Sequence, residues 1–308
     1  MFRNPGFRLL LLAVCGLYFS VFARAVPAAG QAAEPPEKPE QQPVQDASRA
    51  WCQSTGSSGT WCQSTASSGH GMDMNVPSGV SDKCEPEFTY EEGPRGPSHW
   101  EGVCNTGHMQ TPINITKAQM IPIPPLPPLE FSYRPADLDM VNDCNTYEIK
   151  ARFPENHWLK VARKPYRLSE IDFHEPGENA VNGIRPPMSV LMVHLSPEST
   201  LLVIEVPVVE GKENPVIKTL WEHIPNSGKE RAVKGVKINP ADLLPADHGF
   251  YRFPGSLTTP ICNEGVQWYL MKNPIEMSKA QIDTYKKYYH DTARPLQPLN
   301  NRLLVESK

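Results

Sequence analysis

From residue 84 to residue 308, short runs of β-branched and aromatic residues alternate with turn residues. The clearest of these apolar runs cover residues 147–153, 188–195 and 201–209. Their length and their flanking Pro, Gly and Asn residues predict strands. Helical patterns are scarce, and the best are 216–223 and 278–289, where Ser278 and Gln281 have the spacing of a capping box. The pattern predicts a mainly β domain with a few surface helices.

The first 25 residues have the pattern of a secretory signal peptide. Arg3 and Arg8 precede an apolar run over 9–23, and small residues follow at a suitable cleavage site. The run is short for a membrane helix, so cleavage is favoured over the alternative, an uncleaved signal anchor. No later stretch is long and apolar enough to span a membrane. We expect a secreted or extracytoplasmic protein with no transmembrane segment once the signal is removed.

Residues 26–83 are poor in large apolar residues and rich in Pro, Glu, Gln, Ser and Gly, which predicts a disordered linker. The linker contains a tandem repeat, WCQSTGSSGT at 51–60 and WCQSTASSGH at 61–70. Two copies are too few for a solenoid. The repeat is either a duplication in a tolerant linker or a means for Cys52 and Cys62 to pair or to cross-link chains. Residues 84–308 then form the folded domain.

Composition excludes several classes of protein. The 308 residues include 30 Lys and Arg against 34 Asp and Glu, so there is no basic excess for binding nucleic acid. The 33 prolines exclude a helical bundle, and the 20 glycines lack the period of collagen. Of the seven cysteines, Cys15 lies in the predicted signal peptide. The even number that remains favours disulfide bonds in an exported chain.

Several motifs resemble, in family order, those of the compact, exported α-class carbonic anhydrases. They are GPSHW at 96–100, QTPINI at 110–115, FHEPGEN at 173–179, FPGSLTTP at 253–260, EGVQW at 264–268 and RPLQPLN at 294–300. The resemblance implies a large, twisted, mostly antiparallel sheet. It also implies a zinc lyase that hydrates CO2 reversibly to bicarbonate and a proton.

The resemblance implies three zinc-binding histidines, two at alternate positions of one strand and a third on the next. Here His174 matches the second, while Asp172 and Leu191 occupy the first and third positions. Aspartate is a weaker candidate ligand, and leucine cannot ligate. Glu205 is either a replacement ligand or a side chain with a buried polar partner. Zinc, the cofactor of the family, is therefore doubtful in this chain.

Other parts of the family's machinery are retained. Thr258 and Glu178 match the gatekeeping pair that orients zinc hydroxide. The apolar substrate pocket would consist of Val193, Val203, Leu257, Thr259 and Trp268. The proton-shuttle histidine of fast members is replaced by Asn145, and His194 matches a buried structural histidine.

The resemblance also implies a disulfide bond between Cys104 and Cys262, and its layout predicts a second between Cys84 and Cys144. The family usually has a cis Pro-Pro bond after Thr259. Here the pair is Pro260-Ile261, and because a non-proline cis bond costs ~3 kcal/mol, we expect trans.

Three functions are compatible with these residues. The first is an exported carbonic-anhydrase-like domain, catalytically silent or nearly so, that acts as a binding or structural module with an unknown extracellular protein partner. The alternative is an active carbonic anhydrase with an altered metal site, whose substrates are CO2 and bicarbonate. In the third, the cysteine-containing linker drives assembly and the domain is a spacer. The first is favoured because an incomplete ligand set removes the zinc-bound nucleophile.

Overall fold

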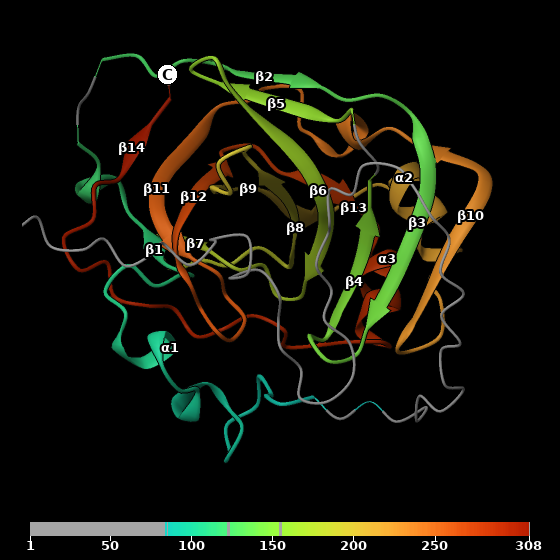
Figure 1. The fold of residues 1–308 in the computed structure, drawn as a ribbon, viewed down its shortest axis with the longest axis horizontal. Coiled ribbons are helices and arrows are strands. Elements are labelled where there is room, and N and C mark those ends of the chain that lie inside the picture. Colours follow the sequence, from blue (N-terminus) through green and yellow to red (C-terminus); the bar gives the residue numbers. More distant parts are fainter. Residues whose placement is uncertain (1–83, 85, 122–123, 154–155, 308) are drawn as a thin grey trace, which may run out of the picture.

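A computed structural model describes residues 84, 86–121, 124–153 and 156–307. Within them, twelve strands form one large mixed sheet, whose main path runs β10-β3-β4-β6-β8-β9-β12-β11-β14 (Figure 1). The predicted signal peptide, the predicted linker and both cysteines of the tandem repeat lie outside the described residues.

The strands are β1 (Asn114–Ile115), β2 (Leu129–Ser132), β3 (Ala136–Asp143), β4 (Glu148–Arg152), β5 (Trp158–Val161), β6 (Lys164–His174), β7 (Ala180–Val181), β8 (Met188–Leu195), β9 (Leu201–Glu210), β10 (Lys229–Ile238), β11 (Phe250–Ser256), β12 (Glu264–Met271), β13 (Ile275–Met277) and β14 (Val305–Glu306). The helices are α1 (Val103–Thr106), α2 (Pro215–Trp221) and α3 (Lys279–Lys286), with short 3-10 turns η2 (Pro97–His99), η3 (Lys117–Gln119) and η4 (Pro240–Leu243).

The three apolar runs singled out in the sequence form β4, β8 and β9, in the interior of the sheet. The neighbouring pairs β4–β6, β6–β8 and β8–β9 are antiparallel, whereas β12 runs parallel to β9. The predicted fold class, a mostly antiparallel sheet with few helices, is confirmed.

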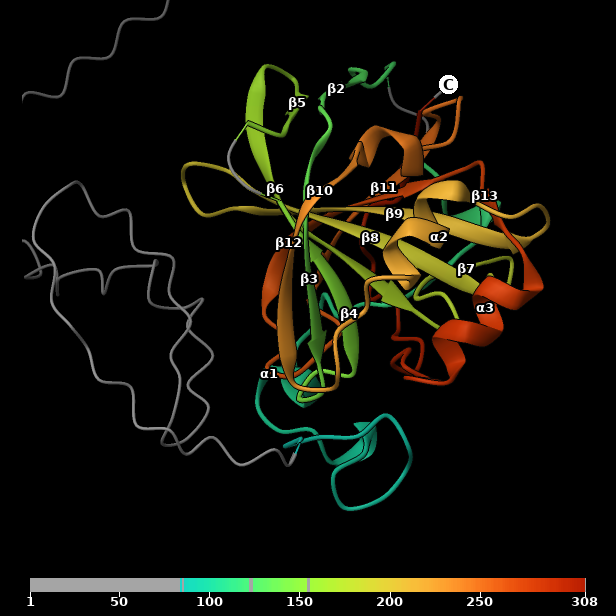
Figure 2. The ribbon, with the colours of Figure 1, turned by 90° about the vertical axis from the view of Figure 1, so that its right-hand side faces the viewer.

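Helices α2 and α3 lie next to each other on one side of the sheet (Figure 2). Asn214 caps α2 by accepting hydrogen bonds from the first backbone N–H groups of the helix. The predicted capping box of α3 is confirmed, because Ser278 and Gln281 each accept from the other's backbone N–H. The two helices are joined by a 2.9 Å hydrogen bond from the Trp221 indole N–H to the carbonyl of Gln281.

Two apolar clusters lie on opposite faces of the sheet, and alternation along β12 separates them. Tyr269 and Met271 belong to the larger cluster, which also contains residues of α2 and α3. Trp268 and Leu270 belong to the smaller one. Since successive strand side chains point to opposite faces, one strand supplies both. The candidate site lies on the face of the smaller cluster.

Both expected disulfide bonds are present, Cys84–Cys144 and Cys104–Cys262. The expectation of a trans Pro260–Ile261 bond is wrong, since this peptide is cis. The loop that contains this peptide bond is held by the Cys104–Cys262 disulfide bond and by two backbone hydrogen bonds. The Cys262 N–H donates to the Thr259 carbonyl, and the Leu257 N–H donates to the Asn263 carbonyl. The prediction rests on the local preference of the peptide bond alone and leaves out these turn hydrogen bonds and the Cys104–Cys262 disulfide bond, which act on the same loop. No helix in the described ranges is long and apolar enough to cross a membrane.

Candidate functional site

Sheet register brings four side chains into one row across neighbouring strands. Lys150 on β4 pairs with Asp172 on β6, Asp172 with Leu191 on β8, and Leu191 with Glu205 on β9. Side chains of directly opposite residues share a face of the sheet. His174, two residues beyond Asp172, lies on the same face and is only 1% exposed. The predicted ligand positions are therefore adjacent, and Lys150 is beside them.

Lys150 forms a buried ion pair at one end of this row. Its Nζ lies 2.8 Å from Glu148 Oε2, 3.8 Å from Glu170 Oε1 and 3.9 Å from Asp143 Oδ2. Burial disfavours the charged ammonium, but the surrounding carboxylates, Glu148 foremost, hold the pKa of Lys150 well above its usual value. The site therefore contains a permanent cation from its own chain.

Glu148 also contacts His174, so it bridges two cationic groups. The Nε2 of His174 lies 3.4 Å from Glu148 Oε1, and its Nδ1 lies 2.8 Å from the Thr292 carbonyl. Because a carbonyl only accepts, Nδ1 carries a proton. Burial opposes ionisation of the ring, but Glu178 and Glu148 raise the pKa of His174 to about 9. The imidazolium form, with both nitrogens donating, fits these contacts.

Asp172 is 5% exposed, and its Oδ1 has no hydrogen-bond partner in the described part of the chain. Burial, and after it the charge of Glu170, raises the pKa of Asp172 well above its usual value. The Tyr90 hydroxyl is buried among the same carboxylates, and burial raises the pKa of Tyr90. The segment that contains Tyr90 is linked to the β3–β4 turn by the Cys84–Cys144 disulfide bond.

Leu191 extends the site's apolar side. It is buried in the smaller cluster together with three predicted substrate-pocket residues, Val193, Val203 and Trp268. A fourth, Leu257, is partly buried and packs against this cluster. Thr258 is buried, and Thr259 beside it is half-buried. The third ligand position is thus part of a continuous hydrophobic wall.

Glu205 has a buried polar partner and is not free to ligate a metal. One of its carboxylate oxygens accepts from the Asn179 N–H at 3.1 Å, and the other from Asn179 Nδ2 at 2.6 Å. The Oδ1 of Asn179 accepts in turn from the N–H of Ile113 at 2.7 Å. Burial raises the pKa of Glu205 to about 7. Of the two interpretations left open by the sequence, the structure supports the structural one.

Comparison with known proteins places this site in a family. The family model of eukaryotic-type carbonic anhydrase matches residues 95–308, well over half of the chain. The chain belongs to the α-carbonic anhydrase family. A carbonic anhydrase from Nostoc sp. is 33% identical over 224 residues, covering 70% of this chain and 84% of the relative.

Two further relatives of this α-carbonic anhydrase domain show the breadth of the family. Dioscorin dioA3 from Dioscorea japonica is 32% identical over 233 residues, covering 71% of this chain and 85% of dioscorin. The solved structure of a hyperthermostable carbonic anhydrase from a hydrothermal vent chimney superimposes with a TM-score of 0.67 at 35% identity, covering 72% of this chain and all of that one.

Carbonic anhydrases of this family depend on zinc, and the residues of this chain do not fit the ion. A catalytic zinc site normally uses three protein ligands from His, Cys or carboxylate side chains. Leu191 offers no donor atom, and the Nε2 of His174 faces Glu148 at 3.4 Å. In the ranges that the structure describes, no three His, Cys, Asp or Glu side chains are grouped to hold a metal.

Sequence reasoning missed Glu148 and Lys150. Their alternate positions in the predicted strand 147–153 place both on one face, which could have drawn attention to them. Asn145, at the shuttle position, is exposed in the turn before β4. His194 is fully buried, and its Nε2 lies 2.5 Å from the Tyr133 hydroxyl.

Proposed function

We propose that this chain is a catalytically silent α-carbonic anhydrase domain that acts outside the cytoplasm as a binding or structural module. The observation that carries the proposal is the contact chain Lys150–Glu148–His174 beside Leu191. In active members of the family, zinc supplies the hydroxide that attacks CO2. Here Lys150 and the His174 ring supply positive charge, and Glu148 neutralises part of it.

The retained Thr258–Glu178 pair is compatible with silence, because both residues are buried and Glu178 lies beside the His174 ring. Glu178 is fully buried, and its Oε1 lies 3.4 Å from His174 Nδ1. Burial raises the pKa of Glu178, while the His174 ring and the Thr258 hydroxyl oppose that shift. Neither carboxylate oxygen of Glu178 has a hydrogen-bond partner in the described residues. The nearby charge of the His174 ring therefore offsets the cost of burying Glu178, whether or not a reaction takes place.

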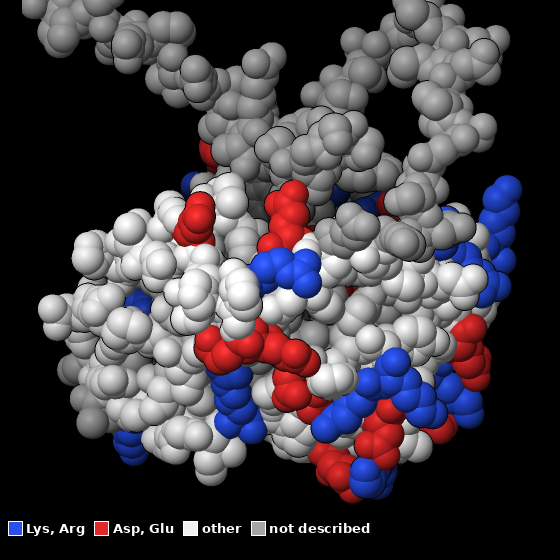
Figure 3. Space-filling view, turned by 90° about the horizontal axis from the view of Figure 1, so that it is seen from below, with Lys and Arg blue, Asp and Glu red and all other residues white. Residues whose placement is uncertain are grey.

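The two disulfide bonds support action in an oxidising compartment, as does the signal-like sequence at 1–25. On the face shown in Figure 3, acidic and basic side chains are interspersed among uncharged ones. Such a mixed surface favours a protein or a small molecule as partner over nucleic acid, which is bound by extended basic patches.

Zinc titration of the purified chain tests the proposal, with the double variant Asp172→His/Leu191→His as the matched comparison. We expect no stoichiometric zinc in the native chain and a gain of zinc binding in the double variant. A third variant that adds Lys150→Gln should bind zinc more tightly than the double variant, because the competing ammonium is gone. One tightly bound zinc per native chain would overturn the proposal in favour of an active enzyme with an altered metal site.

A further inference from the structure

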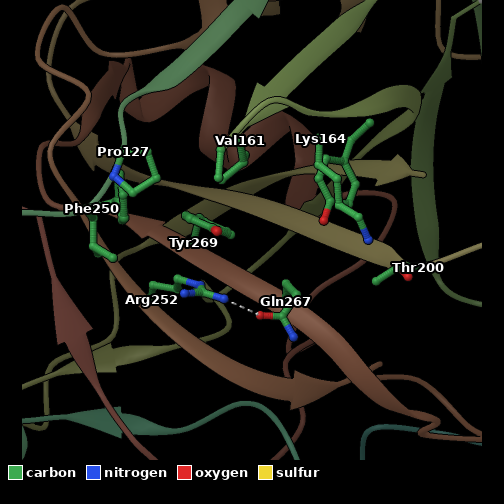
Figure 4. A pocket seen from close by; sticks show the side chains of 11 residues that line it. Pro127, Val161, Lys164, Thr200, Phe250, Arg252, Gln267 and Tyr269 are labelled. Carbon is green, nitrogen blue, oxygen red and sulfur yellow. Dashed lines mark hydrogen bonds between the residues drawn. The ribbon is translucent and has the colours of Figure 1, made fainter. Parts of the chain in front are cut away.

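A hollow lies on the face of the sheet opposite the candidate site. Its volume is about 470 Å³, within the range of small-molecule pockets. The residues that define its chemistry are Lys164, Tyr166, Thr200, Phe250, Arg252 and Tyr269 (Figure 4). Five of them lie on β6, β11 and β12, and Thr200 directly precedes β9, so this part of the wall is built on strands.

The two faces of β12 separate this pocket from the former metal site. Tyr269 and Gln267 line the pocket, while Trp268 between them packs in the smaller cluster with Leu191. Tyr269 pairs in register with Arg252 on β11, which brings both side chains to the pocket face. A ligand in this pocket would therefore not contact the candidate site.

Arg252 is a positioned cation within the pocket. Its Nη2 donates to Gln267 Oε1 at 3.1 Å, drawn as the dashed line in Figure 4, and its guanidinium carbon lies 5.7 Å from the Tyr269 ring centroid. In the described residues it forms no ion pair with a carboxylate. Two neutral neighbours thus fix its orientation and leave its charge uncompensated.

The remaining walls are largely apolar, with one more cation at the rim. They combine three aromatic residues with the aliphatic residues Leu126, Pro127, Val161 and Ala162. Phe250, Tyr166 and Tyr269 are buried residues that line the pocket, so each contributes a small apolar area to its wall. Lys164 lies 3.6 Å from Glu198, but both side chains are more than half exposed, and such a pair is weak. Lys164 can therefore turn toward an anion without a large loss.

We propose that this pocket binds a small aromatic monocarboxylate. A guanidinium fork matches a carboxylate in a bidentate manner, and the apolar walls, aliphatic and aromatic together, match a small hydrocarbon ring. An inorganic oxyanion would use the charge of Arg252 but would leave the apolar walls uncovered.

The test is ligand-observed ¹⁹F NMR of 4-fluorobenzoate with the full chain. We expect saturable binding of 4-fluorobenzoate and at least about tenfold weaker binding of 4-fluorobenzamide, which has the same ring without the charge. Arg252→Gln should weaken the binding of 4-fluorobenzoate by a similar factor. Arg231→Gln, an exposed position on β10, is the matched control and should leave binding unchanged.

Thr200→Trp provides a second variant, which fills the pocket without changing charge and should abolish binding. Thermal unfolding of each variant checks that it is folded. The proposal is overturned by absence of saturable binding to the native chain, by equal binding in Arg252→Gln, or by inorganic phosphate competing more strongly than benzoate. Any of these results leaves the proposed catalytic silence untouched, because the two sites lie on opposite faces of the sheet.

Discussion

Replacement of Lys150 by Met should strongly destabilise the domain. Lys150 and Glu148 are 2.8 Å apart, with side chains 13% and 7% exposed, so the pair is buried. Removing one partner of a buried pair leaves the other charge uncompensated and costs about 3–5 kcal/mol. Glu148 would retain only His174 as a cationic contact, and Asp172 and Glu170 would lose the attraction of the Lys150 ammonium. The free energy of unfolding should therefore fall by about 3 kcal/mol or more.

Urea unfolding followed by tryptophan fluorescence measures this loss. For a domain of this size, it corresponds to a fall in Tm of about 6–12 °C. Lys218→Met is the control, since Lys218 and Glu213 are both more than half exposed and removing that pair should change stability by less than about 1 kcal/mol. The double variant Lys150→Met/Glu148→Gln should lose less free energy of unfolding than the sum of the losses in the two single variants. A loss below about 1 kcal/mol in Lys150→Met would refute the view that this ammonium holds the site together.

Three further predictions concern the rest of the domain. Burial lowers the pKa of His194 to about 4, so its neutral form contributes stability that is complete above pH 6.5 and is lost as the pH falls through 4. His194→Gln should flatten the acid side of the stability curve by roughly 3 kcal/mol, and an unchanged slope would contradict this. Loss of the Cys84–Cys144 bond, which spans 60 residues, should cost about 4 kcal/mol in the Cys84→Ser/Cys144→Ser variant, a value that calorimetry can check. Gly255→Ala would place a Cβ 2.1 Å from Thr111 Oγ1 and 2.8 Å from Trp268 Cδ1, so its unfolding midpoint should drop, with a loss of about 1–3 kcal/mol.

Local patterns predict a mainly β domain with a few helices, and the resemblance of the motifs to α-class carbonic anhydrases implies the large sheet and the three ligand positions. Alternation along the strand that ends at His174 places Asp172 on the same face without any knowledge of neighbouring strands. The capping box of α3 likewise depends on residues three positions apart. Such features are encoded by spacing within one segment.

The ion-pair network could not be predicted, because it depends on pairing between strands. Lys150 lies beside Asp172 only through the β4–β6 register, which a single sequence does not reveal. The partner of Glu205 is Asn179, 26 residues earlier in the chain. The pocket around Arg252 combines residues from several strands, and none of them forms a motif by itself.

Stopped-flow CO2 hydration by the full chain, with zinc supplied in slight excess, tests the central claim most directly. For the native chain we predict a rate equal to that of buffer with the same free zinc. For Asp172→His/Leu191→His we predict a higher rate, because the gatekeeping pair Thr258–Glu178 is retained. Hydration by the native chain above the buffer rate, abolished by a zinc chelator, would contradict the account.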